Sequence, residues 1–215
     1  LAPARVAAGV VETGVDGLAI SDSRTPYIFD DNLPILHVTA ADSGATIATA
    51  FSYGNHAEVR WSGNQQLTSD YYGAARKYVE QGLPAVTTAE GVDKPALPGL
   101  GGITLSFAGA VGGLINPGRG GAKDYADRAD FGGDHTWAAM DAVGQRVAMH
   151  VLQAVHGGGL RDLGDEPPLS FAHVPFLLRV NNPTFELGAF VLKLIERNVY
   201  NVVRRMGGYE PDRPY

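Results

Sequence analysis

The spacing of apolar residues changes along this chain, and this change constrains the fold more than any other feature. Residues 35–40 (ILHVTA) and 46–53 (TIATAFSY) are apolar and rich in β-branched side chains, and the turn formers Asp, Ser and Gly stand between them. This pattern predicts an antiparallel β-hairpin. Upstream, residues 1–32 are rich in Gly, Ala and Asp, which predicts irregular structure with one or two short strands at 6–11 and 18–20.

Two later stretches repeat apolar residues every three to four positions, which is the period of an amphipathic helix. The first begins at Ser69 or Asp70, both of which can cap a helix, and stops at Gly82. The second is the clearest in the chain: Asp134 can cap its start, and the glycines at 157–159 end it. The length of its apolar stripe predicts that it packs on a large apolar surface.

The remaining signals extend an alternation of strands and helices. Residues 102–111 predict a buried strand that runs into an irregular Gly-rich loop, and residues 168–180 predict a strand that its proline places at an edge or a bulge. Asn182 and Pro183 then begin a third helix. The alternation predicts an α/β or α+β layered fold, with a mixed sheet flanked by helices. Residues 1–215 show no internal repeat or linker, which predicts a single domain or the middle portion of a larger catalytic domain.

Composition narrows the classes of function. A chain of 215 residues with 45% hydrophobic content can bury a substantial core. It has 23 acidic against 17 basic residues and a formal charge of -6, and the basic residues are scattered, which argues against a nucleic-acid partner. It opens on Leu1 and has no apolar run long enough for a transmembrane segment, so none is expected. Because cysteine is absent, a metal would be held by His, carboxylate, Tyr or backbone oxygen.

His56 has the most suggestive setting of the six histidines. The strand predicted at 46–53 ends directly before it, Gly54 lets the backbone turn, and Glu58 follows two residues later. An imidazole at a strand end can project into the region where layered α/β folds place their sites. Spacing alone leaves two interpretations open, a structural histidine or a metal ligand.

The other histidines favour structural or surface roles. His37 and His173 lie within predicted strands, and His150 and His156 are six residues apart on a helix and so face different sides. His135 opens that helix, where capping by the preceding Asp explains the local sequence without chemistry.

The Gly-rich loop after the strand at 102–111 is a second candidate for a site. Backbone N–H groups of Gly109, Ala110, Val111, Gly112 and Gly113 could support an oxyanion or a phosphate, because glycine permits close approach. A plain exit from a strand explains the loop equally well, and its sequence matches neither a Walker loop nor a dinucleotide fingerprint. No Gly-x-Ser-x-Gly motif or Cys offers a covalent nucleophile, so no catalytic side chain is assigned.

Several motifs, taken in order, resemble the catalytic domain of the neutral/alkaline ceramidase family and its bacterial members. The motifs are ADSGATIATAFSYGNHAEV (41–59), NQQLTSDYYGAARKYVE (64–80), TLSFAGAVGGLINPG (104–118), GGDHTWAAMDAVGQRVA (132–148) and PFLLRVNNPTF (175–185). The resemblance covers nearly the whole chain, and the ordered set is more specific than any single motif.

The resemblance implies a zinc hydrolase of sphingolipid metabolism. That family cleaves the amide of N-acyl sphingoid bases with one zinc held by two His, a Glu and a Tyr, and His56 matches the second His. The other three ligands belong to segments that do not match this chain, so the resemblance implies the central portion of a catalytic domain that needs the rest of that domain as its partner. It also implies ceramide, another N-acyl lipid or a smaller amide as substrate, and a secreted or periplasmic location.

Three positions depart from the family pattern. Ala110 stands where the family has a Ser, Leu114 where its loop has an Asp, and Ala57 where a Pro is common. The serine-dependent mechanism is therefore excluded, which leaves hydrolysis by metal-activated water. Two further classes stay open: a non-catalytic relative that binds a ligand or partner through the Gly-rich cleft, and a nucleotide-binding α/β module.

Overall fold

The structure is a computed structural model, and it describes residues 3–14, 28–109, 114, 121–167 and 170. The chain divides into two compact units, Leu1–Pro167 and Pro168–Tyr215, and every helix and strand described here lies in the first. The strands expected at 18–20 and 168–180 and the helix expected from Asn182 fall outside the described residues, except for Ser170, which has no regular secondary structure.

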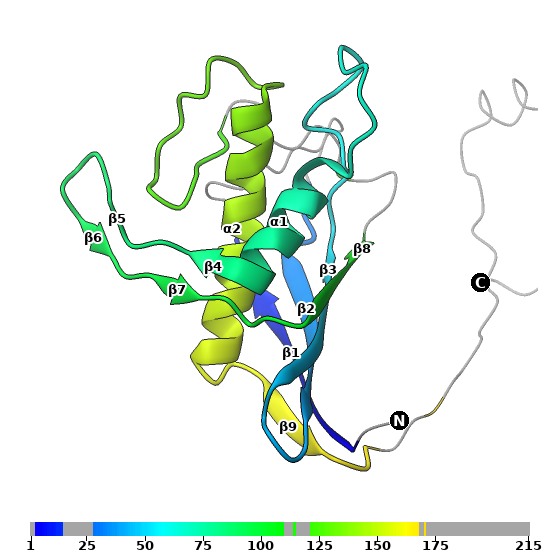
Figure 1. The fold of residues 1–215 in the computed structure, drawn as a ribbon. Coiled ribbons are helices and arrows are strands. Elements are labelled where there is room, and N and C mark those ends of the chain that lie inside the picture. Colours follow the sequence, from blue (N-terminus) through cyan, green and yellow to red (C-terminus); the bar gives the residue numbers. More distant parts are fainter. Residues whose placement is uncertain (1–2, 15–27, 110–113, 115–120, 168–169, 171–215) are drawn as a thin grey trace, which may run out of the picture. The chain divides into compact units, whose positions relative to one another are not determined.

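A five-stranded mixed sheet forms the centre of the first unit (Figure 1). Its order is β8-β3-β2-β1-β9; β3 and β8 run parallel, and the other neighbours are antiparallel. The strands are β1 (Ala4–Glu12), β2 (Asn32–Ala40), β3 (Thr46–Tyr53), β8 (Ile103–Ala108) and β9 (Arg161–Gly164). The predicted hairpin is confirmed as β2 and β3, and so is the mixed sheet with helices.

The first strand is longer than the sequence predicts. β1 pairs with β2 along its whole length, from Ala4 opposite Ala40 to Glu12 opposite Asn32. Its alanines and glycine carry a weak local signal, and the strand forms because β2 supplies a complete set of backbone partners. Local propensity is overridden here by pairing with a distant segment.

Two helices cover one face of the sheet (Figure 1). They are α1 (Asp70–Gln81) and α2 (Trp137–His156), and neither of the two is long and apolar enough to cross a bilayer. Side chains of both helices share a core with Leu33 and Ile35 of β2 and with Phe51 and Tyr53 of β3. Burial of this apolar surface drives the layered arrangement.

The start of α2 differs from the prediction. Thr136, not Asp134, is the N-cap, and its side-chain oxygen accepts a hydrogen bond from the backbone N–H of Ala139 at 3.0 Å. Asp and Thr can both cap a helix, and Thr136 stands three residues before Ala139, whose backbone N–H has no partner within the helix. The predicted ends are correct, since α1 stops before Gly82 and α2 before Gly157.

The other face of the sheet exposes apolar side chains. On β8 the large apolar side chains of Ile103, Leu105 and Phe107 are exposed, whereas Thr104 is buried and Ser106 accepts a hydrogen bond from Arg76 of α1 at 2.9 Å. The prediction of a fully buried strand at 102–111 was wrong, because an apolar run by itself does not reveal that one face lacks cover. An open hollow of about 500 Å³ on this face is lined mainly by β1, β2 and β3.

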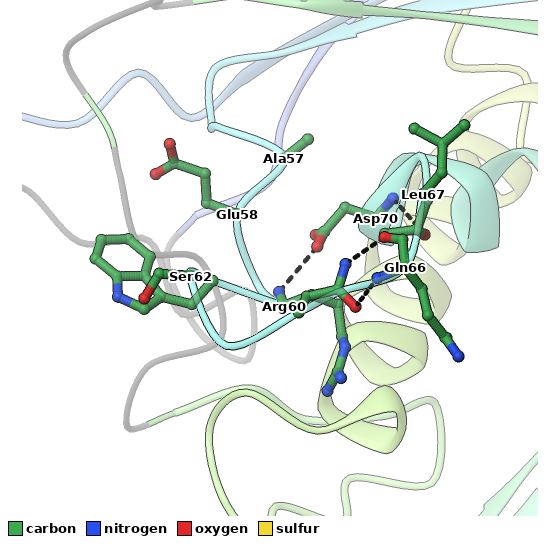
Figure 2. A pocket seen from close by; sticks show the side chains of 10 residues that line it. Ala57, Glu58, Arg60, Ser62, Gln66, Leu67 and Asp70 are labelled. Atoms are coloured by element: carbon green, nitrogen blue, oxygen red, sulfur yellow. Dashed lines mark hydrogen bonds between the residues drawn. The ribbon is translucent and has the colours of Figure 1, made fainter.

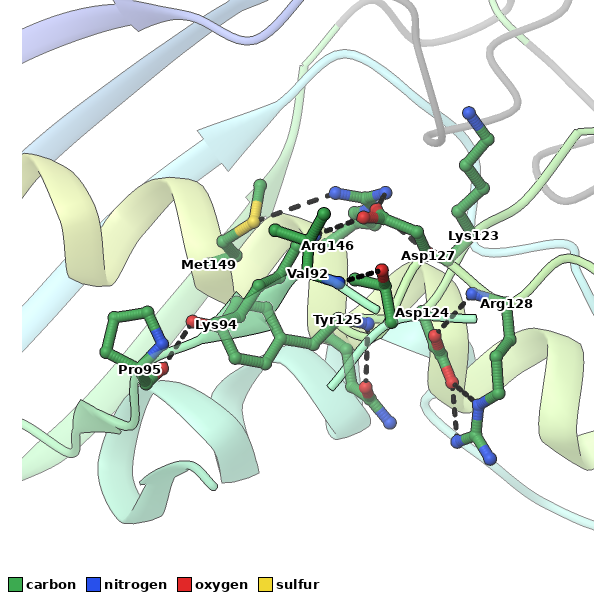
Figure 3. A network of polar contacts seen from close by, with 12 residues as sticks. Val92, Lys94, Pro95, Lys123, Asp124, Tyr125, Asp127, Arg128, Arg146 and Met149 are labelled. Carbon is green, nitrogen blue, oxygen red and sulfur yellow. Dashed lines mark hydrogen bonds and ion pairs between the residues drawn. The ribbon is translucent and has the colours of Figure 1, made fainter. Parts of the chain in front are cut away.

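Two pairs of short strands extend from the end of α1 (Figure 1). They are β4 (Gly82–Leu83) with β7 (Leu97–Pro98), and β5 (Val86–Thr87) with β6 (Asp93–Lys94). A network of ion pairs joins this arm to α2 (Figure 3): Asp127 accepts from Lys94 at 2.5 Å and also from Arg146. Burial alone would raise the pKa of Asp127, but the two cations lower it overall, so Asp127 stays ionised and binds both segments together.

The half-buried His150 on α2 predicts a specific dependence of stability on pH. Burial, with Arg146 as a smaller contribution, lowers the pKa of His150 to about 4. The folded state therefore holds His150 neutral, while the unfolded chain takes up a proton below roughly pH 6.5. Because the unfolded state then binds more protons, the free energy of unfolding should fall as the pH drops from about 6.5 to about 4.

Replacing His150 by Gln should reduce this slope in urea unfolding measured across that pH range. Some slope should remain, because burial and the nearby His156 lower the pKa of His37 in the same direction. An unchanged slope in the His150→Gln variant would show that His150 is accessible to protons in the folded protein.

Candidate functional site

His56 lies in the turn that follows β3. Its backbone N–H is held twice, by the carbonyl of Leu114 at 3.1 Å and by the side-chain oxygen of Asn55 at 3.1 Å. Its side chain is 24% exposed, so the backbone is fixed while the ring reaches solvent. The structure thus places His56 at a strand end with an accessible imidazole, as the sequence predicts.

Glu58 lies beside the ring of His56. The distance from His56 Nδ1 to Glu58 Oε1 is 3.4 Å, and the Glu58 side chain is 41% exposed. Imidazole and carboxylate are both ligand types that zinc accepts, so the donor chemistry fits. Across residues 3–14, 28–109, 114, 121–167 and 170, no group of three or more His, Asp or Glu side chains could hold a metal ion. The described residues therefore fit part of a zinc site.

Two residues of the Gly-rich loop, Gly109 and Leu114, bond to the end of β3 and to His56. Gly109 donates its N–H to the carbonyl of Tyr53 at 2.8 Å, and the carbonyl of Leu114 accepts from His56. A Cβ on Gly109 would lie 3.0 Å from Gly54 Cα, so this close approach depends on glycine. The role of Gly54 is the same, since a Cβ there would lie 3.1 Å from the carbonyl oxygen of Asp30.

The candidate oxyanion loop is described only at its first residue. Ala110, Val111, Gly112 and Gly113 lie outside the described residues. Gly109 already donates its N–H to Tyr53, so donors for an oxyanion have to come from residues 110–113.

A pocket of about 460 Å³ opens next to this turn (Figure 2). Its lining comes from one stretch of the chain, residues 57–70: Ala57, Glu58, Arg60, Trp61, Ser62, Asn64, Gln66, Leu67, Thr68 and Asp70. Glu58 lies both on the pocket wall and beside His56, so the pocket and the imidazole are neighbours.

Asp70, one of the two residues expected to cap the first helix, contacts the stretch that lines this pocket. Its carboxylate accepts hydrogen bonds from the backbone N–H groups of Val59 at 3.0 Å and Arg60 at 2.9 Å, which Figure 2 shows in part. It also accepts from the N–H of Tyr71 at 2.8 Å. Asp70 therefore joins the start of α1 to the stretch that follows Glu58.

His135 also contacts this stretch, which the sequence did not indicate. Its Nδ1 lies 2.8 Å from the carbonyl of Val59, and its ring stacks on Trp61 with centroids 5.9 Å apart. Arg60 bonds to the carbonyl of His135, and its guanidinium lies 4.3 Å from the ring centroid of Trp137. These contacts hold Arg60 and Trp61, two of the residues that line the pocket.

The ring nitrogens of His37 and His156 lie at hydrogen-bond distance from a hydroxyl and a backbone carbonyl, as is typical of structural histidines. His37 Nδ1 lies 3.0 Å from the hydroxyl of Thr49 within the sheet, and His156 Nε2 lies 2.8 Å from the carbonyl of Pro98. His150 lies on α2, and His173 is outside the described residues.

No protein-family model and no curated protein matches this chain. Among solved structures it is similar to neutral ceramidase from Pseudomonas aeruginosa, with 14% identity and a TM-score of 0.49, over 71% of this chain and 22% of that one. A ceramidase complexed with C2 gives 15% identity, a TM-score of 0.48 and the same coverage. The chain thus spans about a fifth of the length of these structures.

Proposed function

We propose that this chain forms part of a zinc-dependent hydrolase that cleaves the amide bond of ceramide or a related N-acyl lipid. One observation carries the proposal: the accessible His56 stands after the end of β3 with Glu58 beside it, and the two residues that flank 110–113 bond to Tyr53 and to His56. The order of motifs in the sequence supports the choice of reaction.

In the proposed hydrolysis, His56, Glu58 and the loop 110–113 have different roles. His56 would offer a ring nitrogen to the metal, and the Glu58 carboxylate, 3.4 Å from Nδ1, would interact with that nitrogen and leave Nε2 as the ligand. When bound, zinc lowers the pKa of its water from ~15.7 to about 7 and polarises the amide carbonyl. Backbone N–H groups from residues 110–113 would stabilise the oxyanion, a contribution of roughly 2.7–4 kcal/mol per donor.

The proposal requires further ligands from outside the described residues. A zinc site of this kind has three or more protein ligands, and among the described residues the proposal assigns one of them, His56. The missing ligands, a second His, a Glu and a Tyr, are those that the sequence resemblance implies. The remainder of the same catalytic domain is therefore the proposed partner of this chain.

The test is the metal content of the full-length protein, together with a screen of N-acyl lipids and smaller amides. We expect about one zinc per molecule, and hydrolysis that a chelator abolishes and added zinc restores. A folded protein that binds N-acyl lipids without metal and without hydrolysis would instead identify a non-catalytic binding protein.

A further inference from the structure

The first turn of α1 makes an unusual set of contacts for the start of a helix. Asp70 is only 4% exposed, and its φ of 53° lies in the left-handed region that non-glycine residues rarely adopt. Strained residues of this kind persist where the surrounding contacts impose them, and they concentrate at functional sites. The contacts that impose it here are the hydrogen bonds from Val59 and Arg60.

The next two residues hold the other side of His56. The hydroxyl of Tyr71 donates to the carbonyl of Asn55 at 2.7 Å. The hydroxyl of Tyr72 donates to the same carbonyl at 2.9 Å and to that of Tyr53 at 2.8 Å. Burial raises the pKa of both hydroxyls, so they stay protonated and remain donors.

Together these bonds enclose the residue that carries the imidazole. Carbonyls just before His56 accept from the two tyrosines, and amides just after it donate to Asp70. These bonds join α1 to the turn that follows β3 and do not close the first turn of the helix, and the side chain of the N-cap Ser69 makes no capping bond. The contacts therefore favour a second role for this turn.

We propose that Asp70, Tyr71 and Tyr72 are positioning residues that set the direction of the His56 ring. This inference rests on the proposed function, in which His56 is a metal ligand. An imidazole that is already held in place loses less conformational freedom when it binds a metal. Their contact with His56 runs through the backbone of residues 53–60.

The chain offers matched variants for a test. Asp70→Asn keeps a side chain that tolerates positive φ, but it sets an amide donor against the N–H of Arg60 where the carboxylate now accepts. Tyr71→Phe with Tyr72→Phe removes the hydroxyls and leaves the rings. Tyr78→Phe is the control: it removes a hydroxyl from the same helix, where the donor bonds to Asp141 of α2 at 2.8 Å.

Two measurements, the NMR signals of the His56 ring and the affinity for zinc, distinguish a role in positioning His56 from a general effect on stability. In the full chain without metal, at fixed pH, the ring signals of His56 in a proton–nitrogen NMR spectrum should move in Asp70→Asn and in the double tyrosine variant, and should stay in place in Tyr78→Phe. In the full-length protein, zinc affinity should fall about 10-fold in the first two variants, at the low end of the range for residues behind a metal ligand.

Unchanged His56 ring signals in both site variants would overturn the inference, and so would an equal shift in Tyr78→Phe. Should Asp70→Asn fail to fold, the double tyrosine variant decides. The ring signals need no metal, so they test the positioning role even if the full-length protein proves to bind no zinc. That result would refute the proposed function alone.

Discussion

Replacing His56 by Ala should abolish zinc binding and turnover together in the full-length protein. The variant removes the proposed ligand, and across the described residues no group of three or more His, Asp or Glu side chains could hold the metal in its place. Zinc content should fall from about one per molecule to near zero, and turnover should fall by several orders of magnitude. Stability without metal should change little, by about 0.5 kcal/mol, since the side chain is partly exposed.

His156→Ala is the matched control for this variant. His156 is also exposed, but it ends α2 and bonds to the carbonyl of Pro98, away from the turn that follows β3. It should keep both zinc and activity. Full zinc content in His56→Ala would contradict the assignment of His56 as a ligand.

Enlarging Gly144 should produce the largest loss of stability in the described part of the chain. Gly144 lies on α2 where it crosses α1, and a Cβ there would sit 2.4 Å from the Cβ of Ala74 and 2.9 Å from the backbone nitrogen of Ala75. The helices meet this closely because all three residues are small. A side chain at Gly144 would push apart the two helices that cover the sheet.

The expected size follows from two opposing effects. Gly144→Ala gains about 1 kcal/mol in helix propensity but overpacks the contact at a cost of about 1–3 kcal/mol, so a net loss is expected. Gly144→Val should lose about 3 kcal/mol or more, since it adds further volume and a less favourable helix residue. Urea unfolding measures both changes.

Ala138→Val controls for the helix propensity of valine. Ala138 is exposed on the same helix, so the substitution should cost less than about 0.7 kcal/mol. A Gly144→Val protein as stable as the Ala138→Val protein would show that α1 and α2 do not pack as described.

The parts of the fold that the sequence predicts are those whose signals are local. The β2–β3 hairpin follows from its turn residues, and the ends of α1 and α2 follow from Gly82 and Gly157. Pairing between distant segments leaves no such signal, so the length of β1 and its partnership with β9 were not predicted. The open face of β8 was missed for the same reason, because cover depends on what other segments bring to that face.

For the candidate site, too, the features with a local sequence signal were predicted, and those that depend on contacts between distant segments were not. His56 stands out because a strand, a glycine and polar residues follow one another in sequence, and its strand-end position is confirmed. The bond between His135 and Val59 joins residues 76 positions apart, and the tyrosine bonds to Asn55 join α1 to the end of β3. Such contacts depend on the packed layers and cannot be recognised from spacing. The roles of Ala110 and Gly112 stay a prediction.

Anomalous diffraction at the zinc edge, from crystals of the full-length protein, tests the central claim most directly. We predict a single strong peak about 2.0–2.1 Å from a ring nitrogen of His56, the distance for zinc bound to imidazole. A zinc peak held entirely by other residues, or a zinc-free protein that still hydrolyses N-acyl lipids, would contradict it.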